Sequence, residues 1–584
     1  MGMPEGIPYY LMGEIMESRL KGTIASNGVT IGKVYKFVKE KVEVDTASID
    51  ADDIDREIEK VKNAIESYRS ELTSRDYETD AEKGVAEAHE ELLSDPYLID
   101  TISDKITNER VTSDNALNQT ILEMVAMMEA LDDEYLKERA LDYKDIGQRI
   151  MYALKGIKPK TLENLDDNYI IISDELTPSD TSTLDKEHTL AFAMDLGGKT
   201  SHVSIIAQTL GIPALVGMGN VTEVLKDGEY IVLDAENGYI IVNPSDETIK
   251  KYEEKINKLE KEKARLESVK TCTPKTEDGH EIQAYCNIGG YDDLIQGLDD
   301  GADGVGLFRT EFLYMNNTHF PTEMEQFEEY KRVAEALEGR DLIIRTLDIG
   351  GDKSLPYYAF PEEENPMLGW RALRVCFDKE DMFKTQLRAI LRASAFGTVK
   401  ILLPMIISVE EIKRVNEILD SLKHELRERK IDFDENLEVG IMVETPASVM
   451  IAEELIKYCD FFSIGTNDLT QYFLAVDRGN EMVSEYYNTY NPAVLRAIKK
   501  VIDASHKAGK ITGMCGGFAG DTDATYLLLG MGLDEFSSPS SKVAKIKDIV
   551  INSNYEDAKE FADEVLALES LTEVLEKIEK NKHK

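Results

Sequence analysis

Charged and polar residues that could take part in catalysis follow the apolar, strand-like segments in the second half of the chain. They are Arg309 after GVGLF, Arg345 in LIIRTLDIGGDK, Glu444 after GIMV, Asn467 and Asp468 after FSIGT, and Cys515 after ITGM. Two more arginines lie in or near the loops, Arg371 in ENPMLGWRALR and Arg478 in AVDRGNE. Taken singly, each arginine is more often a surface or ion-pair residue. Several polar residues that all lie just after predicted strands, however, favour a functional site.

The residue types indicate the chemistry of such a site. Several guanidinium groups directed at one cavity suit a small polyanion, because the planar fork binds carboxylate and phosphate in a bidentate manner. The two carboxylates, Glu444 and Asp468, are too few to cage calcium, but they suit Mg²⁺, which takes further ligands from water and substrate phosphate. Cys515 could be a nucleophile or a proton donor, and its alternative role is that of a small buried hydrophobic residue. The segment GGDK at 350–353 lacks the spacing of a Walker loop.

A second candidate site lies in GGKTSHVSIIAQTLGIPALVG at 197–217. A predicted strand runs into two glycines and is followed by an amphipathic helix, so His202 is expected at or just before the N-terminus of that helix. Free N–H groups and the helix dipole favour an attached phosphate there. Imidazole titrates near neutrality and can act as a nucleophile. A single histidine at a helix start is more often an ordinary polar residue, and both interpretations stay open on this segment alone.

The elements that must position these residues follow from the periodicity of the chain. Residues 20–40 are rich in β-branched residues and predict one or two strands. From about 50 to 155, apolar residues recur at i, i+3, i+4 and i+7, which predicts a block of helices. Past 160 the pattern becomes α/β, and the strands of 20–40 are expected to rejoin it, so that the helical block is an insertion. Residues 246–270 predict one highly charged connecting helix, with a coiled coil as the less favoured alternative.

The remainder, from about 275 to 565, alternates strand and helix patterns. Eight apolar strand candidates occur there, namely IQAYCNI, GVGLF, LIIRTL, VKILLPM, LEVGIMV, FFSIG, ITGMC and DEFSS. Eight βα units in this length predict a (β/α)8 barrel, and the alternative is an open doubly wound sheet. In a barrel the polar residues at the strand ends would meet at one face.

Composition restricts the class of protein. The chain has 584 residues, with 112 Asp+Glu against 67 Lys+Arg and a formal charge of −45. Such a surface argues against a nucleic-acid partner, because phosphates are repelled, and leaves room for a basic protein partner. Part of the excess lies in 41–150, which holds 30 acidic and 13 basic residues.

Cysteine usage and the N-terminus bear on the location of the protein. The five cysteines are scattered and form no CxxC pair, which excludes a disulfide framework and a zinc site and predicts a reducing, cytoplasmic location. The first residues lack the basic region of a signal peptide, and residues 1–19 are interpreted as an N-terminal appendage. Runs of about 18 apolar residues are absent from the sequence, so no membrane insertion is predicted.

Motifs of both halves together resemble one family. GGKTSHVSIIAQTLGIPALVG is similar to the phosphohistidine signature of Enzyme I of the bacterial sugar phosphotransferase system, the phosphoenolpyruvate–protein phosphotransferases. The family's phosphoenolpyruvate-site motifs are matched, in order, by GLFRTEFLYM (306–315), NPMLGWRALR (365–374), GIMVETPAS (440–448), GTNDLTQY (465–472), VDRGNE (476–481) and TGMCGGFAGD (512–521). The resemblance runs from about residue 20 to at least residue 550.

The resemblance implies a reaction and roles for the residues. Phosphoenolpyruvate would bind with Mg²⁺ in the barrel, and His202 would take its phosphoryl group while Cys515 protonates the enolate to give pyruvate. Thr181 matches a hydroxyl that orients the active imidazole. The implied metal ligands are Glu444 and Asp468, and the implied substrate contacts are Arg309, Arg345, Arg371, Asn467 and Arg478.

The resemblance also implies the domain plan and the partners. The phosphoryl group would pass from a swivelling domain to a histidine of the small carrier protein HPr, which would dock on the helical insertion, and the barrel would form a homodimer. The expected parts are an N-terminal appendage (1–19), a phosphohistidine α/β domain (20–44 and 156–245), the helical HPr-binding insertion (45–155), a linker helix (246–272) and the phosphoenolpyruvate-binding, dimerising barrel (273–584).

The sequence departs from the family pattern at four places, none of which is a proposed contact residue. Lys199 replaces a common arginine, Asn27 replaces a usual proline, Gly517 stands where glutamate is usual, and the segment at 537–545 differs. They bear on rate and affinity more than on the type of reaction. A non-catalytic phosphoenolpyruvate-sensing or partner-binding protein on the same scaffold is the alternative function. A dikinase would need a nucleotide-binding domain, of which the sequence shows no motif.

Overall fold

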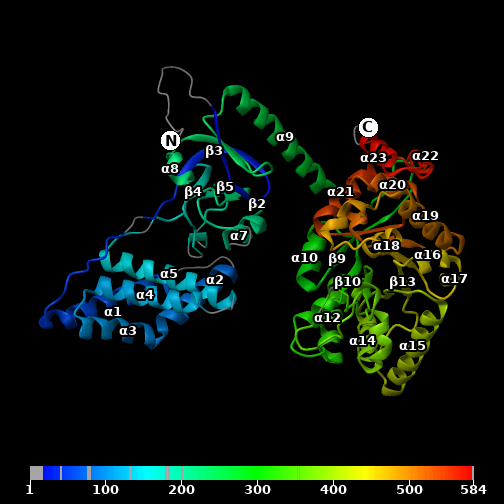
Figure 1. Ribbon diagram of the computed structural model, residues 1–584, viewed down its shortest axis with the longest axis horizontal. Helices are drawn as coiled ribbons and strands as arrows, with labels where there is room; N and C mark the ends of the chain where they lie inside the picture. The colour runs from blue at the N-terminus through cyan, green and yellow to red at the C-terminus, as the bar shows by residue number, and fades with distance from the viewer. Residues whose placement is uncertain are drawn as a thin grey trace. The chain divides into compact units, whose positions relative to one another are not determined.

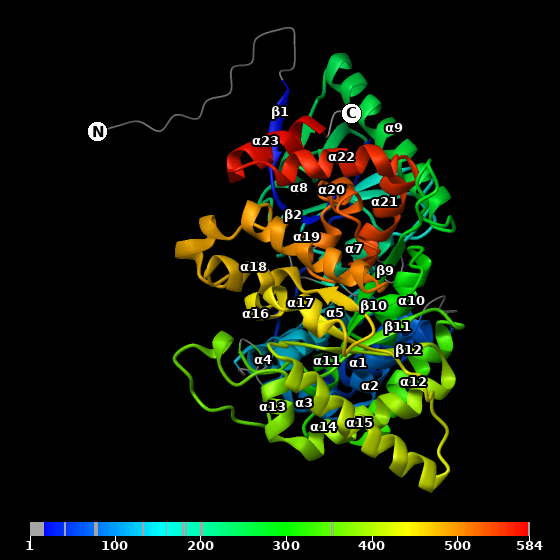
Figure 2. The ribbon, with the colours of Figure 1, turned by 90° about the vertical axis from the view of Figure 1, so that its right-hand side faces the viewer.

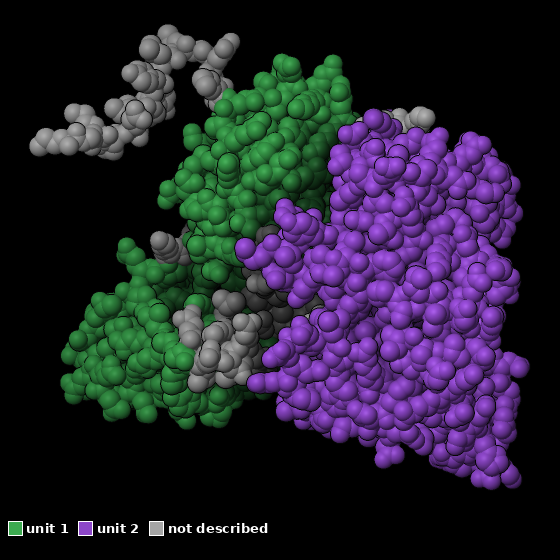
Figure 3. All heavy atoms as spheres, turned by 45° about the vertical axis from the view of Figure 1, so that its right-hand side comes forward, with its two compact units in different colours: residues 1–260 green, residues 261–584 purple. Residues whose placement is uncertain are grey.

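The computed structural model describes residues 17–39, 42–74, 80–130, 134–158, 160–177, 180–181, 184–198, 202–351, 353 and 355–581. It contains two compact units, residues 1–260 and 261–584 (Figure 3). The boundary between them falls inside the helix α9 (Asp246–Val269), in the segment expected to be a linker helix. The mixed α/β multidomain architecture predicted from the sequence is confirmed.

The first unit is built on an eight-stranded mixed sheet (Figure 1). Its spatial order is β1-β8-β7-β3-β4-β5-β6-β2, in which β3 to β6 run parallel and the other pairs are antiparallel. The strands are β1 (Ser18–Lys21), β2 (Thr23–Ser26), β3 (Val29–Lys36), β4 (Tyr169–Ser173), β5 (Thr189–Met194), β6 (Ala214–Val216), β7 (Tyr230–Asp234) and β8 (Tyr239–Val242). The short helices α7 (His202–Leu210) and α8 (Val221–Val224) connect strands of this sheet. The strands before residue 40 therefore share one sheet with those after 160, as expected.

The N-terminal part of this sheet holds three strands rather than one or two. β1 begins at Ser18 and pairs with β8, so the last two residues of the expected appendage belong to the sheet. The guanidinium of Arg19 lies 4.6 Å from the ring centroid of Tyr239 on the neighbouring strand. The sequence SRLK shows no apolar alternation, and the strand forms because β8 offers it a partner edge. Gly28, with φ of +140°, allows the turn between β2 and β3.

Among the described residues, five α-helices form the block inserted between β3 and β4. They are α1 (Ile54–Ser74), α2 (Asp80–Ser94), α3 (Pro96–Glu109), α4 (Ser113–Glu129) and α5 (Glu134–Lys155). The N-termini of α3 and α4 are capped by Asp95 and Thr112, whose side chains accept hydrogen bonds from free N–H groups of the first turn. Apolar side chains of the block bury one another in a core of its own.

The second unit is a closed barrel of eight parallel strands (Figure 2). They are β9 (Gln283–Ile288), β10 (Val305–Arg309), β11 (Leu342–Arg345), β12 (Val399–Leu403), β13 (Val439–Val443), β14 (Phe462–Ile464), β15 (Thr512–Met514) and β16 (Glu535–Ser538). Seven of them lie within the predicted segments, β10 extends one residue past GVGLF to Arg309, and β16 pairs with β9 to close the ring. The prediction of a (β/α)8 barrel is confirmed, and the open doubly wound sheet is not found.

Helices surround these strands and bury the outward side chains. They are α10 (Tyr291–Asp299), α11 (Glu311–Met315), α12 (Glu323–Ala336), α13 (Leu373–Asp378), α14 (Glu380–Ala393), α15 (Val409–Arg429), α16 (Pro446–Met450), α17 (Ala452–Leu455), α18 (Thr466–Leu474), α19 (Pro492–Lys507), α20 (Thr525–Gly530), α21 (Ser540–Ile551), α22 (Tyr555–Leu566) and α23 (Leu571–Asn581). A separate small cluster of buried side chains comes from alternate strand positions and includes Leu307, Leu402 and Met442. This period of two leaves the residues at the strand ends to line the mouth of the barrel.

Each half of α9 is bound to a different unit. Near its start, Tyr252 donates a hydrogen bond to Asp234 of β7, and Lys255 pairs with Glu236. In its last part, Arg265 forms an ion pair of 2.6 Å with Asp548 of α21. The helix therefore belongs to both units, which explains why the boundary falls within it. Within the described residues, none of the helices combines the length and the apolar character needed to cross a membrane.

A matched pair of glycines tests this packing. A Cβ atom at Gly530 of α20 would lie 1.9 Å from the carbonyl oxygen of Ala558 on α22, whereas a Cβ at Gly84 of α2 would meet nothing within 4 Å. We expect Gly530→Ala to destabilise the second unit by about 1–3 kcal/mol through overpacking. Gly84→Ala should stabilise the first unit by about 0.5–1 kcal/mol through helix propensity. Calorimetric midpoints of the two units measure both effects, and an unchanged second transition in Gly530→Ala would contradict this account of the α20–α22 contact.

Candidate active site

A cavity of about 300 Å³ opens at the mouth of the barrel. All eight barrel residues singled out from the sequence line it, and they are Arg309, Arg345, Arg371, Glu444, Asn467, Asp468, Arg478 and Cys515. Three further charged residues, Glu311, Asp348 and Lys353, also line it, together with apolar side chains such as Leu307 and Met442. The barrel topology thus brings together residues that are up to about 200 positions apart in the chain, because parallel strands end at the same face.

Arg345, at the end of β11, is held by carboxylates on both sides. Its Nη2 donates a short hydrogen bond to Glu311 at the start of α11, and its Nη1 lies 3.2 Å from Oδ2 of Asp348. Lys353 adds a hydrogen bond of 2.9 Å to the same Glu311. Burial favours the neutral form of the arginine, but the two carboxylates outweigh it and raise the pKa of Arg345. This guanidinium therefore stays charged inside the cavity.

Arg371 links two carboxylates of the cavity. Its Nε and Nη2 donate to Asp348, with the Nη2 distances at 3.0 and 3.1 Å, and its Nη1 lies 3.3 Å from Oδ1 of Asp468. The hydroxyl of Tyr472 accepts a further hydrogen bond of 3.1 Å from Nη1. Burial alone would raise the pKa of Asp348, but Arg345 and Arg371 hold it well below its usual range. Asp348 is thus an ionised counter-charge shared by two arginines.

The two predicted metal ligands lie in different environments. Glu444 is fully buried at the end of β13, where its Oε1 accepts a hydrogen bond of 2.7 Å from the backbone of Met405. Its Oε2 has no hydrogen-bond partner among the described residues. Burial raises the pKa of Glu444 to about 8, and the nearby Asp468 and Asp348 add to the rise. An orphaned buried carboxylate oxygen beside a second carboxylate fits a divalent cation, which supplies the missing positive charge.

The described part of the chain holds no cluster of three or more His, Cys, Asp or Glu side chains arranged to hold a metal ion. Glu444 and Asp468 would therefore supply two of the ligands of a metal ion and not a full coordination shell. This number matches Mg²⁺, which commonly uses one or two carboxylates and completes its octahedron with water and substrate phosphate.

Cys515 lies at the floor of the cavity. Its sulfur accepts a hydrogen bond of 3.3 Å from the hydroxyl of Ser463 on β14. Burial raises the pKa of the Cys515 thiol to about 11, although Ser463 and Arg345 act in the opposite direction. At neutral pH the side chain is a protonated thiol, which suits a proton donor better than a nucleophile.

The remaining predicted residues border the cavity more loosely. Arg309 is half-buried at the end of β10, and Nη1 of Arg478 lies 3.9 Å from Oδ1 of Asp468. Asn467 is exposed, and its Oδ1 accepts a hydrogen bond of 3.0 Å from the backbone of Gly517. A Cβ atom at Gly517 would lie 3.1 Å from that oxygen. Glycine at this position, in place of the family's usual glutamate, therefore avoids a tight contact with the Asn467 side chain.

In the first unit, His202 is the first residue of α7, which agrees with its expected place at a helix N-terminus. Its side chain lies outside what the structure describes, and so do Lys199, Thr200 and Ser201. Thr181, the predicted imidazole orienter, is buried, and its hydroxyl donates a hydrogen bond of 3.3 Å to the carbonyl of Thr177.

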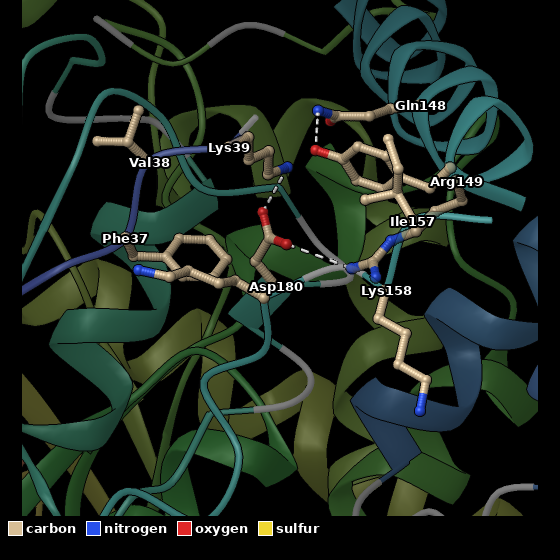
Figure 4. A pocket seen from close by; sticks show the side chains of 10 residues that line it. Phe37, Val38, Lys39, Gln148, Arg149, Ile157, Lys158 and Asp180 are labelled. Carbon is tan, nitrogen blue, oxygen red and sulfur yellow. Dashed lines mark hydrogen bonds and ion pairs between the residues drawn. The ribbon is translucent and has the colours of Figure 1, made fainter. Parts of the chain in front are cut away.

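The residue before Thr181 joins the helical block to the α/β part of its unit. Asp180 is buried beside a small cavity of about 50 Å³ and forms ion pairs of 2.6 Å with Lys39 and 3.2 Å with Arg149 of α5 (Figure 4). It also accepts hydrogen bonds from the backbone and hydroxyl of Thr177. The peptide that carries Thr181 is therefore fixed by charges from both parts of the unit.

Sequence reasoning missed the residues that hold the predicted ones in place. Glu311, Asp348 and Asp180 lie within three positions of a predicted residue, and Lys353 lies in the GGDK segment, eight positions after Arg345. The available signal was a carboxylate two or three residues beyond an arginine at a strand end, as in FRTE and RTLD. Of the other departures, Asn27 lies in the turn between β2 and β3, and the segment at 537–545 covers the end of β16 and the start of α21.

Comparison with known proteins matches nearly the whole chain. Family profiles of PEP-utilising enzymes fit in three parts, the N-terminal part at 21–139, the mobile domain at 165–238 and the PEP-binding domain at 263–555. A phosphoenolpyruvate-protein phosphotransferase of Buchnera aphidicola subsp. Schizaphis graminum is 44% identical and covers 96% of this chain and 99% of its own. One from Staphylococcus carnosus is 42% identical and covers 97% and 99%. An Enzyme I protein solved by NMR is 41% identical over 41% of this chain and 99% of its own, with a TM-score of 0.38.

A second buried glutamate inside the barrel gives a pH prediction. Glu535 of β16 is 1% exposed, lines no described cavity, and has its pKa raised to about 8 by burial. Between its ordinary value of 4.5 and about 8, the folded protein holds a proton that the unfolded chain has lost, so stability falls as pH rises through this window. We expect Glu535→Gln to flatten this slope by up to about 1.4 kcal/mol per pH unit, measured by urea unfolding of the magnesium-free protein. An unchanged slope would mean that Glu535 is ionised in the fold.

Proposed function

The chain belongs to the phosphoenolpyruvate-protein phosphotransferases, and we propose that its barrel cavity binds phosphoenolpyruvate and that His202 receives the phosphoryl group. As an enzyme of this family it catalyses the first step of the sugar phosphotransferase system, phosphoryl transfer from phosphoenolpyruvate to protein. The observation that carries the assignment of the site is the convergence of four arginines, four carboxylates and one protonated thiol in a single cavity.

The cavity suits the substrate by charge and by shape. Phosphoenolpyruvate carries a carboxylate and a phosphate, each of which can accept paired hydrogen bonds from a guanidinium. Arg345 and Arg371 are fixed by Glu311, Asp348 and Asp468 before any ligand arrives, so little side-chain freedom remains to be lost on binding. Arg309 and Arg478 are more exposed and would close on the substrate from the rim.

Glu444 and Asp468 would hold Mg²⁺ at this site, where the ion would supply positive charge to the phosphoryl oxygens. Oε2 of Glu444, which has no hydrogen-bond partner in the described structure, supports this role. The pair lies in the same cavity as the arginines, which would share the stabilisation of the charge on the phosphoryl group.

The transfer itself requires a nucleophile and an acid. A ring nitrogen of His202 would attack the phosphorus, so that a P–N bond forms while the P–O bond to the enol breaks. The electron pair of the resulting enolate would take the proton of Cys515 at C3, which gives pyruvate and leaves a thiolate. Water would then return a proton to the sulfur. Thr181 would orient the imidazole, and the buried ion pairs of Asp180 keep its peptide in place.

The second acceptor is proposed to be the carrier protein HPr. The helical block, expected at 45–155, is strongly acidic, and a basic carrier would be attracted to it over a distance of about a Debye length. Dimerisation through the barrel and a cytoplasmic location are parts of the same proposal. The location is supported by five cysteines that form no disulfide, of which four are buried.

The alternative, a non-catalytic sensor on the same scaffold, gains no support from the relatives, which are named as transferases. A sensor would be free to lose the acid and the paired carboxylates, yet Cys515, Glu444 and Asp468 are all present and share one cavity.

Incubation with phosphoenolpyruvate and Mg²⁺ tests the proposed function directly. We expect one acid-labile phosphate per chain, which mass spectrometry of the protein and its peptides would place on His202. His202→Ala should abolish the label, because the nucleophile is gone, whereas His188→Ala, in the same unit, should retain it. Absence of the label from the unmodified protein, or equal labelling of His202→Ala, would refute the assignment.

The metal assignment is tested with two buried glutamates. Glu444→Gln should raise the magnesium concentration needed for half-maximal activity at least about tenfold, because an anionic ligand is lost. Glu535→Gln removes an equally buried carboxylate outside the cavity and should leave the requirement unchanged. Titration of Mn²⁺ by electron paramagnetic resonance gives the same comparison without turnover.

In the unmodified protein, metal binding should strengthen as pH rises toward 8, because the metal competes with the proton on Glu444. Equal metal affinity in both variants would remove Glu444 from the ligand set.

A further inference from the structure

The layer of side chains beneath the cavity is divided chemically. One side is apolar and includes Leu402 and Ile343, with Leu307 and Met442 reaching the cavity lining. The other side is polar, and it contains Ser463 of β14, Ser537 of β16 and Asn287 of β9. Ser537 donates a hydrogen bond of 2.6 Å to Asn287, and the Asn287 amide donates to the backbone carbonyl of Cys515. The polar side of this layer thus lies under the thiol.

Ser463 contacts the thiol itself. It is fully buried, and its register partners on the neighbouring strands are Met442 and Gly513. Cys515 follows Gly513 by two positions and therefore faces the same interior. The hydroxyl of Ser463 donates to Sγ of Cys515 at 3.3 Å, and within the described residues this is the hydrogen bond that its side chain makes. A serine hydroxyl has one hydrogen to donate, so its hydrogen bond to the sulfur fixes the direction of the buried O–H bond.

The contact has consequences for both protonation states of the sulfur. While Ser463 occupies one lone pair, the S–H bond must point elsewhere, and the carbonyl of Ile464, at 3.9 Å, is too distant to hold it firmly. The hydrogen is therefore available to the cavity above. After the proton has left, the buried thiolate needs hydrogen-bond donors, and the Ser463 hydroxyl already lies in place to be one.

We propose that Ser463 is a positioning residue for the protonation step: its hydroxyl orients the Cys515 thiol and stabilises the thiolate that remains when the proton moves to C3 of the enolate. In this step a C–H bond forms and the S–H bond breaks, and water later restores the thiol. The proposal rests on the proposed function, because it takes Cys515 to be the acid of that reaction.

The charged groups that face the sulfur lie on or just after three other strands. Arg345 of β11 favours the thiolate, whereas Glu444, which follows β13, and Glu535 of β16 disfavour it. Arg345 is already bound to Glu311 and Asp348, so its charge is partly neutralised. Of the two groups that favour the thiolate, Ser463 is the one in hydrogen-bond contact with Sγ. Removal of its hydroxyl should therefore destabilise the thiolate.

The test compares three serine variants of the full chain. Ser463→Ala should lower kcat for pyruvate formation about tenfold, the value of one hydrogen bond, while KM for phosphoenolpyruvate stays near that of the unmodified enzyme. Ser463→Thr keeps the hydroxyl and should restore most of the rate. Ser505→Ala removes another fully buried hydroxyl, which bonds to Thr512 and not to the thiol, and should behave as the unmodified enzyme. Equal kcat in Ser463→Ala and Ser505→Ala would overturn the proposal, and so would a Ser463→Thr variant as slow as Ser463→Ala.

A second measurement separates this inference from the proposed function. The rate at which methyl methanethiosulfonate modifies Cys515, followed by mass spectrometry of its peptide over a range of alkaline pH, needs no substrate, metal or carrier. Ser463→Ala should shift this profile to higher pH and Ser463→Thr should not, and identical profiles for all variants would overturn the proposal. A shifted profile in a protein that fails to label His202 would support the contact and refute the proposed function.

Discussion

Between the guanidinium groups of Arg345 and Arg371 lies one buried carboxylate, that of Asp348, and both arginines donate to it. Several cations gathered in one cavity repel one another, and the repulsion is strongest for side chains that are buried away from water, as Arg345 and Arg371 are. Asp348 allows them to stay inside. Glu311 does the same for Arg345 and Lys353 on the other side. The fold therefore holds the positive groups of the cavity in fixed positions, and their side chains need little further ordering when a ligand binds.

The same network connects the anion-binding part of the cavity with the carboxylate pair. Arg371 spans Asp348 and Asp468, so displacement of either carboxylate would move the guanidinium and with it the other carboxylate. Glu444 stands apart because its one described hydrogen bond comes from a backbone amide and not from a cation. The cavity contains an ion-paired region beside a buried acid that has no ion-pair partner. Under the proposed function this difference would direct the anionic substrate to one region and the metal ion to the other.

Much of this arrangement could be predicted from the sequence, for physical reasons. The eight barrel strands are short apolar runs because both of their faces are buried, and a parallel barrel must bring the ends of all eight to one mouth. The supporting residues could not be assigned in this way. That Asp348 serves Arg371 as well as Arg345 depends on the path of a loop, and that Ser463 meets Cys515 depends on the register of β14 and β15. β1 was missed because its strand character comes from its partner and not from its own pattern.

The burial of Cys515 also bears on how the protein withstands oxidants. Peroxides attack the thiolate and leave the thiol almost untouched. Burial raises the pKa of the Cys515 thiol to about 11, so that its sulfur stays protonated at neutral pH. Cys272, in contrast, is exposed to solvent. The burial that keeps the proton on the sulfur of Cys515 therefore also protects this thiol from peroxides.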